Sequence, residues 1–344
     1  MKIKSLRVQN FRKHKDFKVD FKKDVTIIIG ENGIGKTSLI EAIYIALTGK
    51  SWRSNFNEIT KQKSDWWRID VMVDDEKRTI KFKNNQKTFE IDGKKFSRLP
   101  QKNKMAVILF EPSDLNLLYN SPSARRDFLD KFITGTDIKH QKNINKYEKI
   151  LRQRNNLLKN GATTDELFVW DIQFADLASE IIIKRIEMID KINKYITREY
   201  KKIANKPDKI TLKYSYPITV NVNTKPNLRQ NILSELHNNY KKELLIGYTS
   251  LGPHQHDILF QFNNKSASET ASRGENRTII WALKSIEYQF NSENSPLILL
   301  DDILSEFDEN HQNNLIKSFT NQQIIITGVK SLKNRKNLAI FNIV

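Results

Sequence analysis

Cysteine is absent from this 344-residue chain. Without a thiol there is no disulfide framework, thiolate nucleophile, cysteine-ligated zinc finger or cysteine-ligated iron–sulfur cluster. Long apolar runs are absent too, because no stretch approaches the roughly 18 uncharged apolar residues of a membrane helix. The N-terminal MKIKSLRVQNFRKH has neither the apolar segment nor the small-residue cleavage site of a signal peptide. We therefore expect a cytoplasmic protein with no membrane anchor.

Acidic residues are scarce relative to basic ones. The chain has 58 Lys and Arg against 40 Asp and Glu, a formal net charge of +18. The excess lies in residues 1–120, with 25 basic and 15 acidic residues, and in residues 121–245, with 24 and 15, whereas residues 246–344 carry 9 and 10. This distribution predicts a polyanion-binding face, with nucleic acid as the expected polyanion. A compositional bias toward Lys, Asn and Ile is an alternative explanation of the charge.

Residues 1–115 alternate between strand and helix signals. Apolar residues alternate over 3–8 and 17–21, and a continuous apolar run covers 25–29. Apolar residues then recur at three-to-four spacing from Thr37, and Gly49 is typical of a helix end. A short strand meander over 69–91 and a buried strand over 105–110 follow. This pattern is typical of an α/β fold.

Helical periodicity replaces the α/β pattern after Pro122. Stretches without proline or glycine predict helices over 123–133, 137–159 and 171–200. A strand is predicted over 209–222, and α/β patterning resumes near Leu251. The remaining predicted elements are a helix over 276–290, a buried strand over 297–300, a helix over 308–320 and a strand over 322–328. We therefore assign residues 1–115 and 246–344 to one lobe and residues 116–245 to an inserted, mainly helical second lobe.

A phosphate-binding loop separates the strand over 25–29 from the helix that follows. Residues 30–37 read GENGIGKT, which fits G-x-x-x-x-G-K-[ST] in full between a strand and a helix N-terminus. The loop's backbone N–H groups and the helix dipole bind phosphates, Lys36 reaches the β and γ phosphates, and the Thr37 hydroxyl ligates Mg²⁺. The predicted nucleotide-binding residues are Gly30, Glu31, Asn32, Gly33, Ile34, Gly35, Lys36 and Thr37.

Two further motifs complete the expected site. The strand over 297–300 ends in Asp301 and Asp302, of which Asp301 is expected to hold the Mg²⁺ shell and Asp302 to polarise the attacking water. Ser272-Arg273-Gly274-Glu275 stands directly before a predicted helix. The order of these motifs resembles that of ABC-type ATPases, in which the signature serine and helix of one subunit bind the nucleotide of the other. This resemblance adds Ser272 and Gly274 to the nucleotide-binding residues and Lys36 and Asp302 to the catalytic ones.

Six segments spread over nearly the whole chain resemble the RecF family of DNA replication and repair proteins, in that family's order. They are LRVQNFRKHKDFKVDF, GENGIGKTSLIEAIYIALTGKSWR, FEPSDLNLLYNSPSARRDFLD, TSLGPHQHDILF, SRGENRT and LLDDILSEFDENHQNNL. The resemblance is weak between about 131 and 245. It implies an α/β fold with an ABC-type P-loop ATPase head and an inserted helical lobe.

This chain departs from the RecF pattern at five positions. Glu275 stands where the family has glutamine, and Gln255 and His256 replace an arginine and an aspartate in G-P-H-R-D-D. Asn120 replaces a glycine and Phe307 a leucine. The changes at Glu275 and Gln255 alter charge, so we expect them to affect the response to nucleotide rather than the fold.

The resemblance implies an ATP-dependent protein that binds double-stranded and single-stranded DNA at gaps and helps RecR and RecO to load RecA. ATP and Mg²⁺ are the implied cofactors, and an ATP-dependent homodimer is the implied assembly. Asp302 is one methylene shorter than the usual catalytic glutamate of ABC enzymes, which predicts slow turnover rather than none. Together with the resemblance, this leads us to expect a weak, DNA-stimulated ATPase that acts as a switch. Candidates for DNA contact or for packing within a lobe are Arg125 and Arg126, together with Lys and Arg on the helices of the inserted lobe, which we call the arm.

Three other functions are alternatives to this interpretation of the sequence. An SMC-like chromosome-structuring ATPase has head halves separated by hundreds of coiled-coil residues, whereas about 130 residues lie between the lobes here. A transporter or translation-factor ABC ATPase has a switch histidine after the strand that follows the acidic pair, where this chain reads Thr327-Gly328-Val329. The third reading is a DNA-binding scaffold that holds ATP with little hydrolysis.

Overall fold

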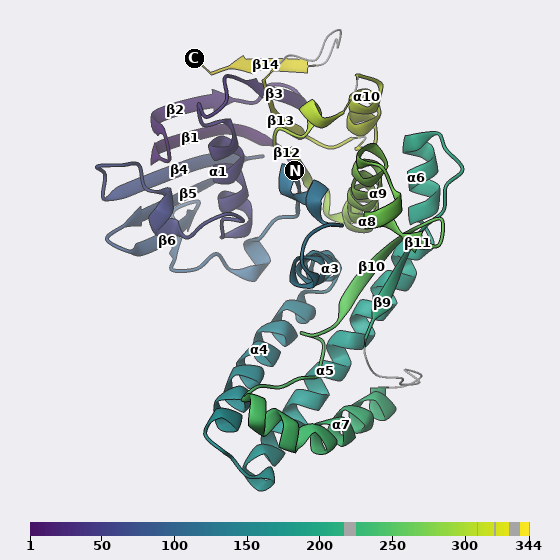
Figure 1. Cartoon of the computed structure of the whole chain (residues 1–344). Coiled ribbons are helices and arrows are strands. Elements are labelled where there is room, and N and C mark those ends of the chain that lie inside the picture. The colour runs from purple at the N-terminus through teal and green to yellow at the C-terminus, as the bar shows by residue number, and fades with distance from the viewer. Residues whose placement is uncertain (217–224, 308, 320, 330–337, 344) are drawn as a thin grey trace. The chain divides into compact units, whose positions relative to one another are not determined.

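The structure is a computed structural model that describes residues 1–343 except 217–224, 308, 320 and 330–337 (Figure 1). It divides into two compact units: Met1–Asp114 with Glu287–Val344, here called the first unit, and Leu115–Ile286, the second unit. Residues 246–286 pack within the second unit. Their assignment to the ATPase lobe rests on the order of the motifs and stays a prediction.

The first unit contains a parallel sheet and an antiparallel sheet. The parallel sheet has the order β14-β3-β13-β12-β8, with β3 at Val25–Ile29, β8 at Val107–Phe110, β12 at Leu297–Leu300, β13 at Ile324–Gly328 and β14 at Leu338–Asn342. The antiparallel sheet has the order β2-β1-β4-β5-β6-β7, with β1 at Ile3–Phe11, β2 at His14–Asp20, β4 at Trp66–Val73, β5 at Glu76–Lys83, β6 at Gln86–Ile91 and β7 at Lys94–Phe96. The predicted strands over 3–8, 17–21, 25–29, 105–110 and 297–300 and the predicted meander are confirmed.

Helix α1 (Lys36–Thr48) contacts strands of both sheets, and its hydrophobic residues are buried on every side (Figure 1). It begins at the phosphate-binding loop, as predicted. It ends at Gly49, whose φ of 80° lies in the left-handed region that glycine favours. The burial of α1 between two sheets fixes the position of the loop at its N-terminus. The other helical segments of the unit are α2 (Phe56–Ile59), α10 (Glu309–Lys317) and short 3₁₀ turns at Gln101–Asn103, Ser292–Asn294 and Leu304–Glu306.

The second unit is mainly helical. Its elements are α3 (Pro122–Thr136), α4 (Ile138–Lys159), α5 (Thr164–Asn193), α6 (Ile196–Ala204), α7 (Lys225–Ile246), α8 (Ala267–Thr270) and most of α9 (Arg273–Asn291). A small antiparallel sheet has the order β11-β10-β9, with β9 at Ile210–Ser215, β10 at Asp257–Phe262 and β11 at Lys265–Ser266. The 3₁₀ turn Pro112–Asn116 spans the boundary with the first unit.

The predicted helix over 171–200 is wrong in its limits. Helix α5 starts earlier, at a capping box in which the Thr163 hydroxyl and the Glu166 side chain satisfy each other's backbone N–H groups. The chain breaks before α6, because the Asn193 side chain bonds both the N–H and the C=O of Leu212 in β9. Helix α7 was not predicted, and residues 217–222 of the predicted strand over 209–222 lie outside the described residues.

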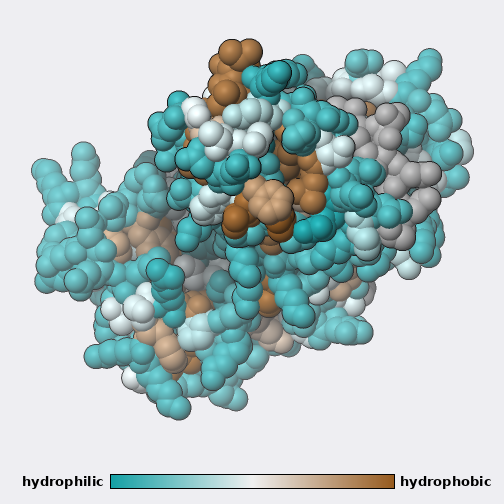
Figure 2. Space-filling model, turned by 90° about the horizontal axis from the view of Figure 1, so that it is seen from below, coloured by the Kyte–Doolittle hydropathy of each residue, from teal (hydrophilic) through white to brown (hydrophobic). Residues whose placement is uncertain are grey.

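The start of α5 and the end of α7 expose large hydrophobic side chains. Figure 2 shows hydrophobic residues gathered in one area of a face that is otherwise mostly hydrophilic. The exposed residues at these two helix ends are Phe168, Val169, Leu245, Ile246 and Tyr248.

In the part of the chain that the structure describes, no helix is long and apolar enough to cross a membrane.

Candidate functional site

The carboxyl ends of the parallel strands meet at one edge of the first unit's parallel sheet. Strands β3, β13, β12 and β8 are neighbours there, with Ile29 beside Gly328 and Leu300 beside Phe110. The phosphate-binding loop leaves β3 at this edge, Asp301 and Asp302 follow β12, and Glu111 follows β8. Ligands in open α/β sheets bind at this edge.

The loop between β3 and α1 has the conformation of a phosphate cradle. Gly33 and Gly35 have φ values of 80° and 113°, which other residues rarely adopt. A Cβ at Gly35 would lie 2.4 Å from Nε2 of His14, a nitrogen that is also 3.0 Å from the Gly35 carbonyl oxygen. Burial lowers the pKa of His14, so its ring is neutral and donates to that carbonyl through Nε2. The ammonium of Lys36 is buried in the loop and donates to the carbonyl oxygens of Gly30 (2.8 Å) and Glu31 (3.0 Å).

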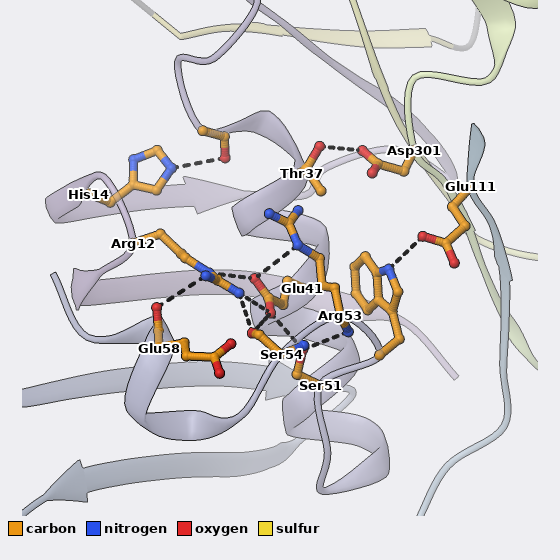
Figure 3. Close-up of polar contacts among 12 residues, drawn as sticks. Arg12, His14, Thr37, Glu41, Ser51, Arg53, Ser54, Glu58, Glu111 and Asp301 are labelled. Atoms are coloured by element: carbon orange, nitrogen blue, oxygen red, sulfur yellow. Dashed lines mark hydrogen bonds and ion pairs between the residues drawn. The ribbon is translucent and has the colours of Figure 1, made fainter. Parts of the chain in front are cut away.

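Asp301 joins the loop to the neighbouring strands. Its Oδ1 accepts a hydrogen bond from the Thr37 hydroxyl at 2.8 Å (Figure 3). It also accepts one from the Thr327 hydroxyl at 2.8 Å. Burial raises the pKa of Asp301, while the hydrogen bonds from Thr327 and Thr37 lower it, as does the charge of Arg53. The site therefore holds a desolvated carboxylate beside a hydroxyl, the ligand pair that Mg²⁺ has in P-loop proteins.

Asp302 has an unusual backbone and an unsatisfied side chain. Its φ is 50°, in the left-handed region, and its N–H donates to the Thr327 hydroxyl at 2.9 Å. Its Oδ1 is buried and accepts no hydrogen bond from the described residues. Such strain and an unpaired buried oxygen are typical of functional positions.

A buried carboxylate in the middle of α1 joins this helix to the turn after β1 and to the segment that follows α1. Glu41 is fully buried and accepts hydrogen bonds from Arg12 (2.9 and 3.0 Å) and from Ser51 (2.6 Å), with Ser54 close by at 3.3 Å (Figure 3). Sequence reasoning missed this cluster. The signal was a glutamate four residues after Thr37 within the apolar run SLIEAIYIAL, where an unpaired charge would be costly.

A second contact missed from the sequence lies at the end of β8. The indole N–H of Trp52 donates to Oε2 of Glu111 at 2.8 Å, which ties the segment after α1 to the strand beside Asp301 (Figure 3). Trp52 and Glu111 are 59 residues apart in the sequence, so no local pattern reveals that they are in contact.

The signature segment lies in the second unit, where Ser272 caps α9. Its hydroxyl accepts from the Glu275 N–H at 3.3 Å, and Glu275 accepts from the Ser272 N–H at 2.9 Å. This is a capping box, which takes glutamate or glutamine equally at its third helical position. Lys206 donates to Glu275 at 2.9 Å, and this hydrogen bond lowers the pKa of Glu275. The glutamate at position 275, where the RecF family has glutamine, thus keeps the helix cap, and Lys206 is its cationic neighbour.

Arg125 and Arg126 pack inside the second unit. Arg125 forms a two-point ion pair with Asp257 at 2.7 and 2.8 Å, and Arg126 donates to the His256 carbonyl at 2.7 Å. Burial, followed by the charge of Arg185, lowers the pKa of His256 to about 3, so its ring stays neutral beside these arginines. The packing interpretation of Arg125 and Arg126 is therefore the one that the structure favours, and Gln255 is exposed.

The structure thus brings one group of predicted residues together and leaves another group in a separate unit. The first group lies in the first unit: the loop residues Gly30, Glu31, Asn32, Gly33, Ile34, Gly35, Lys36 and Thr37, with Asp301 and Asp302. Ser272 and Gly274 lie in the second unit, exposed at the start of α9. Their roles stay predictions.

Comparisons with known proteins match the chain over nearly its whole length. A family described as "AAA ATPase domain" matches residues 1–341. A protein named "DNA replication and repair protein RecF" from Natranaerobius thermophilus is 33% identical over 92% of this chain and 88% of the relative. The protein of that name from Clostridium perfringens strain SM101 is 31% identical over 100% of this chain and 98% of the relative.

Solved structures agree. A structure described as "Structure of the recombination mediator protein RecF-ATP in RecFOR pathway" is 27% identical, with a TM-score of 0.85 over 97% of this chain and 93% of the other. An Smc head bound to the C-winged helix domain of ScpA is 14% identical, with a TM-score of 0.54 over 96% of this chain and 90% of the other. That likeness shows a shared fold alone and agrees with the predicted ABC-type head. By sequence identity and by coverage, the chain belongs to the RecF family of DNA replication and repair proteins.

Proposed function

We propose that this protein is an ATP-dependent DNA-binding protein of recombinational repair and replication restart at gaps, and that its slow ATPase acts as a switch. The observation that carries the proposal is the bond between Thr37 and Asp301 at the mouth of a glycine-rich loop, beside the unsatisfied oxygen of Asp302. The RecF-ATP structure of a relative supports ATP as the nucleotide.

The residues at the sheet edge fit ATP and Mg²⁺. The loop leaves no room for a side chain at Gly35. Among the described residues the buried Lys36 ammonium bonds only to loop carbonyls, so it is available to a phosphate. Thr37 and Asp301 would hold Mg²⁺, which neutralises phosphate charge when bound. The raised pKa of Asp301 reflects a desolvated carboxylate, whose charge a bound Mg²⁺ would stabilise.

The roles of the residues follow from their chemistry. Lys36 and the loop N–H groups would bind the β and γ phosphates, and Glu41 with Arg12 would keep the loop and α1 rigid while they do so. Asp302 would orient a water through its unsatisfied Oδ1, which is held in place by the strained backbone and the bond to Thr327. Because aspartate is a short and weak base, we expect slow turnover.

The exposed start of α9 supports a nucleotide-sandwiched homodimer. Among the described residues, no heavy atom lies within 4 Å of where a Cβ of Gly274 would be, so a phosphate could approach this backbone closely. We propose that Ser272 and Gly274 of one subunit bind the nucleotide held by the other. In this proposal residues 1–115 and 246–344 act as one ATPase lobe, and residues 116–245 act as an arm.

The family relationship supports the DNA side of the proposal. The relative is described as a recombination mediator in the RecFOR pathway. We propose that ATP closes a dimer whose basic surfaces hold double-stranded or single-stranded DNA, and that the dimer helps RecR and RecO to load RecA. Hydrolysis would open the dimer, so that the nucleotide sets how long the protein stays on DNA. A cytoplasmic location stays a prediction.

A test replaces Lys36 by alanine and measures the mass of the protein in solution with and without ATP and Mg²⁺, together with its affinity for gapped duplex DNA. We expect wild type, and a Lys22→Ala control at an exposed lysine, to dimerise with ATP and to bind DNA more tightly. We expect Lys36→Ala to remain monomeric and to lose the effect of ATP on DNA affinity. A Lys36→Ala protein that still dimerises with ATP would contradict the sandwich.

A further inference from the structure

The solvent-facing side of α4 (Ile138–Lys159) is strongly basic. Six exposed basic residues recur along it at intervals close to multiples of a helical turn, and Glu148 is the one acidic residue of this helix. Including the buried Arg154, α4 carries seven basic residues, so it contributes +6 to the charge of the second unit. The exposed six, here called the α4 stripe, are Lys139, Lys142, Lys146, Lys149, Arg152 and Lys159.

In the part of the chain that the structure describes, the α4 stripe has no ion-pair partner. None of its six side chains forms an ion pair with a residue that the structure describes. Three acidic residues of the neighbouring α5 pair with other cations: Asp171 binds Arg154, Asp176 binds Arg229, and Glu180 binds Lys225. Like charges three and four residues apart destabilise a helix, so nothing in the stability of the fold explains this arrangement.

The geometry of the stripe matches a duplex backbone. From Lys139 to Lys159 a helix rises about 30 Å. The first four cations, Lys139 to Lys149, recur about every 5 Å on one side of it, and Arg152 and Lys159 lie further round the helix. A DNA duplex presents one negative charge per roughly 1.7 Å along its axis, so cations spaced along one helix can neutralise several of its phosphates.

The same face lacks the features of a single-strand binder. Single-stranded nucleic acid is held by aromatic side chains on which bases stack. Tyr147, the one aromatic residue of α4, is buried and bonds His254 within the second unit. Between the cations the exposed face presents amide side chains such as Asn145 and Gln153, which also donate to phosphates.

We propose that the α4 stripe is a docking surface for the phosphate backbone of duplex DNA, read without regard to sequence. The proposal rests on the proposed DNA-binding function and gives it a place on the arm. Arg125 and Arg126, which are held by internal contacts, are not part of this surface.

The test compares two full-length variants that lose the same charge. One carries Lys142→Gln, Lys146→Gln and Lys149→Gln in the stripe. The control carries Lys191→Gln, Lys194→Gln and Lys201→Gln, three exposed lysines of the same unit that lie off α4 and form no ion pair with a described residue. Affinity for two 30-base-pair duplexes of unrelated sequence, and for an oligo-dT strand of equal length, is measured by fluorescence anisotropy from 50 to 300 mM NaCl. Thermal melts and ATP affinity verify that both variants are folded.

The stripe variant should lose about ten-fold or more in duplex affinity at 100 mM salt, equally for both sequences. The slope of log K against log salt should fall by about 2.7, which corresponds to three lost phosphate contacts. The control should stay within a factor of about two, and oligo-dT binding should change less than duplex binding. A stripe variant that binds duplex DNA like wild type, or a control that loses as much, would overturn the inference and point to an acidic protein or to solvent as the neighbour of the stripe. A wild type that binds no DNA would overturn the proposed function itself.

Discussion

Asp301 is a buried carboxylate that costs stability when it is ionised, as we expect of the proposed Mg²⁺ ligand. It is almost fully buried, burial raises its pKa, and its hydrogen-bond partners are two neutral hydroxyls rather than a cation. A carboxylate whose folded-state pKa lies above its ordinary value costs stability when it is ionised. That cost is present above the folded-state pKa and is relieved as the pH falls through it.

Asp301→Asn tests this trade-off. The amide removes the desolvated charge and its oxygen can still accept from Thr37 and Thr327. We therefore expect the nucleotide-free variant to melt at a temperature no lower than that of wild type at pH 8. The difference between the two melting temperatures should shrink at acidic pH. We also expect affinity for ATP with Mg²⁺ to fall at least about ten-fold, because a metal ligand is lost. Calorimetric melts and titrations at pH 5 and pH 8 measure both quantities, and a variant that is less stable but binds ATP normally would contradict the assignment.

Glu275→Gln tests the charge at the signature segment. Glutamine keeps the capping box with Ser272 but leaves Lys206 without its carboxylate, so the charge near the proposed phosphate site becomes more positive. We expect ATP-dependent dimerisation to tighten roughly three- to ten-fold and the free energy of unfolding to change by less than about 0.5 kcal/mol.

The chain offers a matched control for Glu275→Gln. Glu166 occupies the same position in the capping box of α5, so Glu166→Gln makes the same change at a second helix start. Light scattering with ATP should show no change in dimerisation for Glu166→Gln. Equal effects of the two substitutions would mean that α9 holds no nucleotide.

At the scale of elements, the sequence predicted the structures that depend on a few neighbouring residues, and it did not predict contacts between distant segments. The loop from Gly30 to Thr37 and its flanking strand and helix were predictable, because a buried strand, a glycine turn and a helix start each leave a signal of a few residues. The cluster around Glu41 and the contact between Trp52 and Glu111 were not, because their partners come from segments tens of residues apart. The break between α5 and α6 was missed for the same reason, since β9 supplies the partner of Asn193.

The helices α4, α5 and α7 are joined by a buried ion cluster. Arg154 is fully buried and bonds Asp171 (2.6 Å), Glu243 (2.6 Å) and the Thr249 hydroxyl (2.7 Å). Glu243 is also fully buried and accepts from the N–H and hydroxyl of Ser250. Loss of one member would leave the others charged in the interior.

Arg154→Ala should therefore lower the free energy of unfolding of the second unit by about 3–5 kcal/mol. Arg152→Ala, two residues away on the exposed side of α4, is the matched control and should change it by less than about 0.5 kcal/mol. Urea melts followed by limited proteolysis report the stability of this unit. An Arg154→Ala protein as resistant as the control would show that the cluster contributes little.

At the scale of the whole molecule, the proposed DNA-coupled switch combines a candidate nucleotide site in the first unit, a capped helix start in the second unit and a net charge of +18. In the proposed function, an assembly of two chains brings the loop of one chain and the signature segment of the other to the same nucleotide. The proposed switch therefore requires ATP hydrolysis that depends on a second copy of the chain and on DNA.

The most direct test is the ATPase rate as a function of protein concentration, with and without duplex DNA, at 50 and 300 mM salt. Asp302→Asn serves as the control for contaminating activity. We predict a slow rate that rises faster than linearly with protein, that DNA stimulates at the lower salt, and that Asp302→Asn lacks. A rate that is strictly proportional to protein and indifferent to DNA would contradict the account.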